Sequence, residues 1–168
     1  MRSTGEVMGI DNDFALAFAK AQISAGFEPP LKGRAFISIK DADKEKVLPA
    51  AKSLFENGFE IVATRGTEKF LRDNGVEATH VNKVVEGRPN IIDSIKNDKI
   101  ALVINTTIGE QSIRDSYSIR RTALLKKIPY CTTIEGATSM VQAISKMLKE
   151  DLSVKTIQEY HKLSLDQI

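Results

Sequence analysis

The segment IALVINT, residues 100–106, opens with five consecutive apolar residues. A strand that is apolar on both of its alternating sides must be covered on both faces, as strands in parallel sheets are. Four more strand-like segments alternate with amphipathic, helix-like segments along the chain. This alternation predicts an α/β fold, namely a Rossmann-like three-layer sandwich with a five-stranded, mainly parallel sheet. The predicted strands are 34–39, 59–64, 78–82, 100–106 and 128–133, and the predicted helices are 41–58, 68–75, 90–98, 112–127 and 136–150.

The two ends of the chain lie outside this alternation. Residues 1–30 predict a helix capped by Asp11 or Asn12, with one apolar face from Phe14 to Ile23. Gly26 can end that helix. EPPLKG is predicted to be a linker, because proline lacks the N–H donor and cannot continue a helix. The predicted division is therefore a helical segment and linker at 1–30, an α/β domain at 31–150 and a helical tail at 151–168.

Composition removes several classes of function. The net charge of +2 is too small to suggest a nucleic-acid-binding protein. No apolar run approaches the roughly 20 residues of a membrane span. Cys131 is the single cysteine, so no internal disulfide forms and a reducing, cytoplasmic location is expected. His80, His161 and Cys131 are too scattered to suggest a metal site.

Polar side chains follow the predicted strands at the points where they end. In an open parallel sheet, ligands bind in the crevice beyond these carboxyl ends. Hydroxyls, an amide, lysines and a glycine turn suit a phosphate group, and the N-terminus of the helix near Thr67 adds a favourable field for an anion. The candidate anion-binding residues are Ser38, Lys44, Thr64, Arg65, Gly66, Thr67, Lys83, Asn105 and Thr107.

Each of these residues also has a simpler explanation. The threonines could be helix caps or plain strand ends, and Lys44 within DKEK could belong to a solvated helix face. A catalytic role finds less support. His80 is expected to be partly buried packing within a strand, and Asp93 and Asp115 are expected to be solvated on helices. No catalytic residue is therefore predicted, and the carboxylate nearest in sequence to the strand ends is Glu86.

Several motifs together resemble one known family. STGEVMG, KGRAFISIKDADKEKV, ATRGTEKFL, VNKVVEGRPNIIDSIKN, VINTT and SIRRTALLKKIPYCTT run in order over nearly the whole chain. They resemble the carboxyl-terminal region of the carbamoyl-phosphate synthetase large subunit, an allosteric domain with a methylglyoxal-synthase-like fold. STGEVMG is similar to the end of the preceding catalytic half, so the chain is expected to be a fragment of a longer subunit.

The resemblance implies ligands and partners. It implies that UMP inhibits and IMP activates, and that both bind at the candidate residues named above. It implies ornithine contacts at Tyr130 and Thr132, with Arg120 and Arg121 as a basic pair of the family. No cofactor is expected in this domain, while the parent enzyme uses ATP and Mg or Mn. The expected partners are the rest of the large subunit and a glutaminase small subunit; self-association is left open.

The sequence departs from the pattern of this family at two places, and two alternative functions are also considered. Arg65 stands where some relatives have histidine, and Glu110 could weaken the field for an anion. A free-standing methylglyoxal synthase, acting on dihydroxyacetone phosphate, would need an aspartate base and histidine partners. VEGRPNI occupies the place where that enzyme carries GGDQ. The nucleotide-binding module of the purine enzyme that closes the ring of IMP is similar in fold, but STGEVMG and NKVVEGRP fit the synthetase better.

Overall fold

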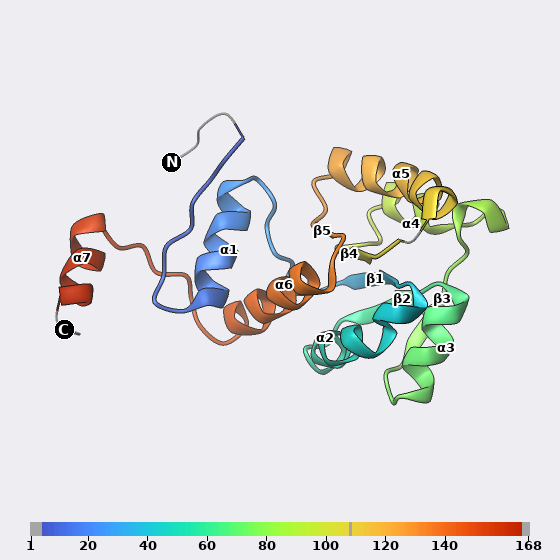
Figure 1. The fold of residues 1–168 in the computed structure, drawn as a ribbon, viewed down its shortest axis with the longest axis horizontal. Coiled ribbons are helices and arrows are strands. Elements are labelled where there is room, and N and C mark those ends of the chain that lie inside the picture. The colour runs from blue at the N-terminus through green and yellow to red at the C-terminus, as the bar shows by residue number, and fades with distance from the viewer. Residues whose placement is uncertain (1–4, 108, 166–168) are drawn as a thin grey trace.

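Five parallel strands form one sheet in the computed structural model, which describes residues 5–107 and 109–165, with the side chains of 109–115 and 163–165 outside that description. The strands lie in the order β3-β2-β1-β4-β5 (Figure 1). Ile37 in the central strand β1 is paired with Ala63 of β2 and Ile104 of β4. The strands are β1 (Arg34–Ser38), β2 (Glu60–Ala63), β3 (Ala78–His80), β4 (Leu102–Asn105) and β5 (Tyr130–Cys131).

Helices cover both faces of the sheet, which confirms the predicted three-layer α/β class (Figure 1). Side chains alternate along β1, so that Ile37 packs against one layer and Phe36 against the other. The layer on the side of Ile37 consists of α2 (Lys44–Glu56), α3 (Arg65–Asp73) and α6 (Ile134–Met147). The layer on the side of Phe36 consists of α4 (Ile91–Lys96) and α5 (Gly109–Leu125).

The order of the strands creates a switch point between β1 and β4. The chain runs outward from β1 through β2 to β3, and then returns to place β4 on the other side of β1. The helix that follows β1 and the helix that follows β4 therefore leave toward opposite faces of the sheet. Such a divergence opens a crevice beyond the carboxyl ends of the two strands.

Several element boundaries differ from the prediction. Helix α3 begins at Arg65 rather than 68, because Thr64 is still extended (ψ 151°) and the helix follows the strand without a turn. Strand β5 has only two residues, Tyr130 and Cys131. The prediction that His80 is partly buried is wrong. It lies on β3, the edge strand, where only Ala78 of the three residues is buried and His80 is exposed.

The N-terminal helix α1 (Phe14–Ser24) packs against α6 (Figure 1). Its cap is neither Asp11 nor Asn12 but Asp13, whose carboxylate accepts hydrogen bonds from the N–H groups of Ala15 and Leu16 at 2.9 and 3.2 Å. The predicted apolar face is partly wrong. Phe14 is exposed and Leu16 and Ala19 are buried, because the stripe that faces α6 is rotated from the predicted one.

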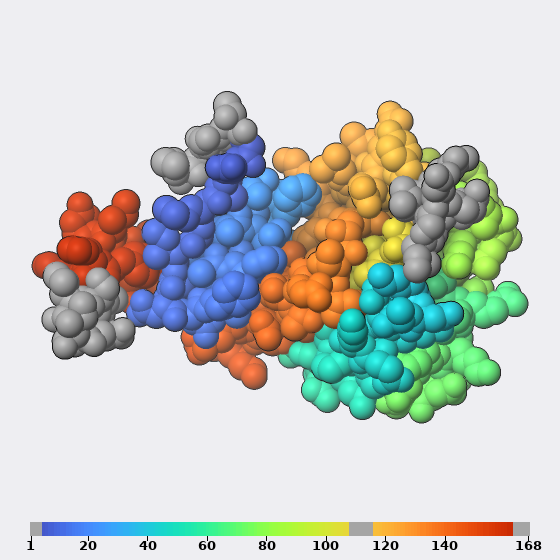
Figure 2. Space-filling model, viewed as in Figure 1, coloured from blue at the N-terminus to red at the C-terminus, as the bar shows by residue number. Residues whose placement is uncertain are grey.

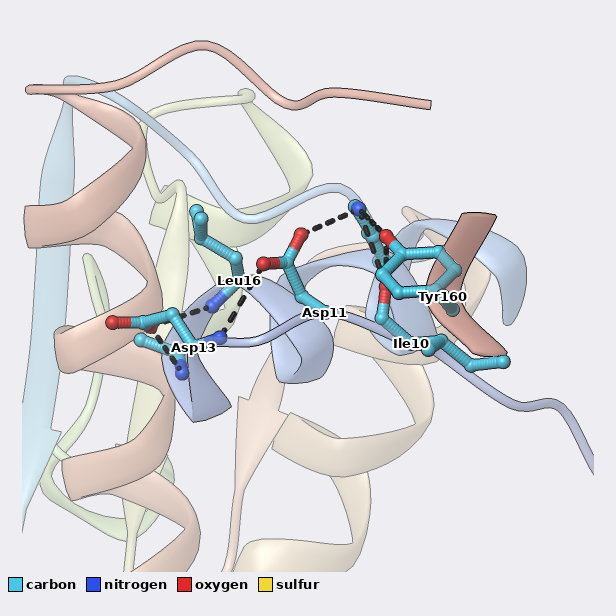
Figure 3. A network of polar contacts seen from close by, with 7 residues as sticks. Ile10, Asp11, Asp13, Leu16 and Tyr160 are labelled. Atoms are coloured by element: carbon cyan, nitrogen blue, oxygen red, sulfur yellow. Dashed lines mark hydrogen bonds and ion pairs between the residues drawn. The ribbon is translucent and has the colours of Figure 1, made fainter. Parts of the chain in front are cut away.

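The C-terminal helix α7 (Ile157–Leu165) lies against the N-terminal segment at the end of the molecule away from the sheet (Figures 1 and 2). Lys20 lies at the centre of this contact, and its ammonium contacts the Asp11 carboxylate at 2.6 Å and the Tyr160 hydroxyl at 3.0 Å. The Tyr160 hydroxyl donates to the carbonyl of Ile10 at 3.0 Å (Figure 3). Although burial opposes it, these hydrogen bonds raise the pKa of Lys20. We call these four residues the Lys20 network.

Candidate functional site

A cavity of about 480 Å³ lies at the switch point, at the carboxyl ends of the central strands. Its size is within the range of sites that hold small molecules. Polar residues from four strand ends and the helices that follow them line one part of it, and apolar residues line the rest. The polar lining residues are Ser38, Lys40, Asp41, Lys44, Thr64, Gly66, Thr67, Lys83, Asn105, Thr106 and Ser116, and the apolar ones are Phe36, Ile39, Val84, Ile91 and Ile119.

Three hydroxyl groups meet beside the start of α3. Thr64 donates to the Ser38 hydroxyl at 3.3 Å and lies 3.4 Å from the Thr67 hydroxyl, which accepts the N–H of Ile39 at 3.1 Å. Thr64 and Thr67 are both almost fully buried. Thr64 occupies the N-cap position of α3, yet its side chain makes no capping hydrogen bond. The simpler explanation of Thr64 as a helix cap is therefore wrong, and its hydroxyl belongs to the cavity wall.

The positive charge of Lys44 lies beside the start of α3. Gly66, in the first turn of this helix, has no side chain, and the Lys44 ammonium lies 3.6 Å from the position that a Cβ atom would occupy there. The first N–H groups of a helix have no partner within the helix, and the helix dipole places partial positive charge there. Lys83, just before the short 3₁₀ helix η2 (Val84–Glu86), also lines the cavity. Two lysines and a helix N-terminus together make this wall attractive to an anion.

One carboxylate also lines the cavity. Asp41, at the start of the 3₁₀ helix η1 (Asp41–Asp43), lies 2.7 Å from the ammonium of Lys44. The hydrogen bond from Lys44, and then the charges of Lys44 and Lys83, lower the pKa of Asp41. Glu86, the carboxylate predicted to be nearest, is instead engaged in accepting the N–H of Lys83 at 2.7 Å.

Asn105 connects this cavity to a second one. Its buried side-chain amide donates to the Ser116 hydroxyl at 3.0 Å and to the Tyr130 hydroxyl at 2.8 Å. Tyr130 lines a neighbouring cavity of about 380 Å³ together with Thr132 and Arg120, whose guanidinium lies 5.7 Å from the centre of the tyrosine ring. Burial raises the pKa of Tyr130, although the Asn105 amide and the Arg120 charge oppose the shift.

Most of the residues predicted for the anion site meet in the main cavity, but two do not. Arg65 is exposed and lies in a shallow depression with Glu68 and Lys69, because a helix that starts at position 65 turns this side chain outward. Thr107 is also absent from the lining, where Thr106 takes its place and accepts the N–H of Lys40 at 3.2 Å. The predicted residues that do line the cavity are Ser38, Lys44, Thr64, Gly66, Thr67, Lys83 and Asn105.

Four polar lining residues are absent from the predicted site. Thr106 lies beside the predicted Thr107, at the same strand end in VINTT. Asp41 and Lys40 belong to a charged run that is typical of a solvated helix face, so the sequence does not assign them to a cavity. Ser116 lies on α5 and reaches the cavity only because that helix packs across the carboxyl end of β4.

Several side chains that were considered for catalysis lie away from the cavity. Cys131 is buried, and burial raises the pKa of its thiol to about 12. Asp93 is not simply solvated, as predicted, but accepts the N–H of Asn90 in a capping box at the start of α4; the side chain of Asp115 lies outside the described residues. In residues 5–107 and 109–165, no cluster of three histidines, cysteines or acidic residues could hold a metal ion.

Comparison with known proteins identifies the fold. Residues 46–132, just over half of the chain, match the family described as "MGS-like domain". The chain belongs to this family. Among solved structures, the methylglyoxal synthase of Elizabethkingia anophelis resembles this MGS-like domain with a TM-score of 0.53, covering 81% of this chain and 93% of that one. With 14% sequence identity, this likeness concerns the fold alone.

Curated relatives of this MGS-like domain are much more similar in sequence. The "carbamoyl phosphate synthase large chain" of Mesorhizobium japonicum is 51% identical over 160 residues, and those of Brucella suis and Nostoc sp. are each 52% identical over 160 residues. These alignments cover 95% of this chain but only 14% of each relative, so the chain spans about one-seventh of their length. The predicted kinship with carbamoyl-phosphate synthetase large subunits is confirmed. In the part of the chain that the structure describes, no helix is both long and apolar enough to cross a membrane.

Proposed function

We propose that this chain is the effector-binding regulatory domain of a carbamoyl-phosphate synthetase large subunit, and that its main cavity binds a nucleoside monophosphate. One observation carries the proposal. Lys44, Lys83 and the buried hydroxyls of Thr64 and Thr67 line a single 480 Å³ cavity beside the start of α3. This is the arrangement by which α/β proteins hold a phosphate group.

The two parts of the cavity suit the two parts of a nucleotide. Lysines, hydroxyls and helix N–H groups offer charged and neutral donors to phosphate oxygens. The apolar lining residues, of which Val84 is partly exposed, offer a surface on which a base can lie. Asn105, whose side-chain N–H groups donate to Ser116 and Tyr130, also has a side-chain carbonyl oxygen that can accept a hydrogen bond from a ribose hydroxyl or a base.

Regulation requires that effectors bind the domain differently in two states of the parent enzyme. We propose UMP as an inhibitor and IMP as an activator, with a coupling free energy of about 1–3 kcal/mol, as is typical of allosteric enzymes. Ornithine is proposed for the second cavity, at Tyr130 and Thr132. The rest of the large subunit and a glutaminase small subunit are the proposed partners. The ATP and Mg or Mn chemistry is assigned to the parent's catalytic part and none to this domain.

Methylglyoxal synthesis is the alternative, and the shared fold is the observation in its favour. That reaction needs a base and an acid placed at the substrate. Among the described residues, no histidine lines the cavity, and its one carboxylate, Asp41, is already paired with Lys44. Binding without turnover is therefore the function better supported. Formation of methylglyoxal from dihydroxyacetone phosphate by the purified chain would establish the alternative.

A thermal-shift series with UMP, IMP and ornithine tests the proposal, because a ligand that binds only the folded state raises the melting temperature. We expect UMP and IMP to raise it in a saturable manner. Lys44→Met should weaken nucleotide binding roughly tenfold to hundredfold, the range for losing a hydrogen bond to a charged group. Lys46→Met is the matched control, since Lys46 is exposed on the same helix and lies outside the cavity lining. Equal loss in both variants, or no shift with any nucleotide, contradicts the proposal.

A further inference from the structure

Asp41 places a negative charge at the rim of a cavity whose other charged lining residues are lysines. Its carboxylate lies 2.7 Å from the ammonium of Lys44, which lies beside Gly66 in the first turn of α3. Lys44 is mostly buried, with its side chain 20% exposed, whereas the side chain of Asp41 is 94% exposed. The lysine is therefore fixed in the wall of the cavity while its acidic partner stands at the rim, open to solvent.

An anion that contacts Lys44 meets the Asp41 carboxylate at the same ammonium. The two negative charges repel each other, and an ammonium group within hydrogen-bonding distance of both must share its donors. Asp41 can leave Lys44 at small cost, because an exposed ion pair contributes little and its carboxylate is readily hydrated. Phosphate carries more charge than a carboxylate and offers more acceptor oxygens, so it should win the contact with Lys44.

We propose that Asp41 acts as an internal counter-anion, which occupies Lys44 and lowers the affinity of the cavity for phosphate-bearing ligands. This inference rests on the proposed function, since it concerns how tightly the same cavity holds an effector. Asp41 is thus an affinity-setting residue that opposes binding, in contrast to the lysines and threonines that favour it. It keeps the cavity's affinity for phosphate groups below the value that its lysines alone would give.

The orientation of η1 supports this assignment. Asp41 and Asp43 both belong to η1, but Asp43 pairs with Lys40 at 3.3 Å, whereas Asp41 alone of the two lines the cavity. The hydrogen bond and charge of Lys44, and then the charge of Lys83, lower the pKa of Asp41. A ligand phosphate that contacts Lys44 would compete with Asp41 for the ammonium that the carboxylate now contacts.

Titration calorimetry of UMP with the 168-residue chain tests the inference. Asp41→Asn keeps the size of the side chain and removes its charge, and we expect it to bind UMP about three to ten times more tightly than the wild type. Glu45→Gln is the matched control. Glu45 is exposed, follows Lys44 directly and does not line the cavity, so its loss of one negative charge should change the affinity less than twofold.

The same change in a Lys44→Met background shows whether Asp41 acts through Lys44. We expect most of the gain from Asp41→Asn to disappear there, because the counter-anion has lost its partner. An equal gain in both backgrounds, or unchanged or weaker binding by Asp41→Asn alone, overturns the inference while leaving the proposed function intact. Absence of UMP binding by the wild type overturns the proposed function itself, so the two failures are distinguishable.

Discussion

The hydroxyl cluster at the carboxyl edge of the sheet and the Lys20 network at the chain ends are both built from polar side chains, but they arise differently. Ser38, Thr64 and Thr67 meet because neighbouring parallel strands end at the same edge. In the Lys20 network, Tyr160 contacts Lys20 and Ile10, which are 140 and 150 positions away in the chain. The first arrangement follows from topology, and the second depends on one tyrosine that anchors a separate helix.

The comparison also separates two kinds of stability. Thr64 and Thr67 of the cluster are buried, so their polar groups must keep their partners or the whole fold loses stability. The Lys20 network lies outside the sheet and holds α7, which can open without disturbing the core. Loss of one contact at the sheet should therefore lower the free energy of global unfolding. Loss of one contact at the chain ends should only make local opening of α7 easier.

Replacement of Thr67 should have the largest effect. Thr67→Val preserves shape but removes the acceptor of the Ile39 N–H, which then stays buried without a partner. We expect the free energy of unfolding to fall by about 1–3 kcal/mol, measured by urea denaturation. Thr79→Val is the control, because Thr79 is exposed on the edge strand β3, and its effect should stay within about 0.5 kcal/mol. Equal effects of the two changes would mean that the cluster is not a tightly packed unit.

The pH dependence of stability tests whether solvent reaches the buried thiol of Cys131. Burial raises the pKa of Cys131 from an ordinary value of 9.0 to about 12. Between pH 9 and pH 12 the unfolded chain loses this proton while the folded chain retains it, so the thiol's contribution to stability, fully present below pH 9, is lost as the pH rises.

Cys131→Ala should remove that part of the alkaline loss. We expect the wild type to lose about 1 kcal/mol more than the variant between pH 8 and pH 10, measured by urea denaturation at both values. The comparison of slopes within each protein cancels any packing cost of the substitution. Identical slopes would show that Cys131 is reached by solvent in the native state.

Tyr160 should give the smallest global effect. Tyr160→Phe removes the hydroxyl that donates to Ile10 and accepts from Lys20, while leaving the ring in place. Hydrogen exchange of the α7 amides should accelerate about fivefold, the effect of losing roughly 1 kcal/mol of local hydrogen bonding. Global unfolding should change by less than about 0.5 kcal/mol. A global loss as large as that of Thr67→Val would erase the distinction between the two regions.

The same distinction explains what the sequence could predict. Alternating apolar and amphipathic segments determine a parallel sheet, and parallel strands bring their ends together, so Lys44, Thr64, Lys83 and Asn105 could be assigned to one edge without knowing any contact. The position of α1 could not be predicted in this way. Its buried face depends on where α6 lies. The apolar residues from Phe14 to Ile23 do not by themselves identify which face of the helix is buried.

Errors within the site have a similar origin. The start of α3 was predicted three residues late, so Arg65 was placed in a turn facing the ligand rather than on the outer side of a helix. The family resemblance assigns Thr107 to the nucleotide site, whereas Thr106, at the same strand end, is the threonine that lines the cavity. Asp41 was missed because a carboxylate in a charged run resembles any solvated helix face.

The central claim is that the cavity at the carboxyl edge recognises the phosphate of a nucleotide. Titration calorimetry of the chain with UMP and, in parallel, with uridine tests it most directly, because the two ligands differ only in that group. The account predicts saturable binding of UMP with one site per chain, and binding of uridine at least tenfold weaker, the loss expected when charge-assisted hydrogen bonds are absent. Equal affinities for the two ligands, or no detectable heat of binding with UMP, would contradict it.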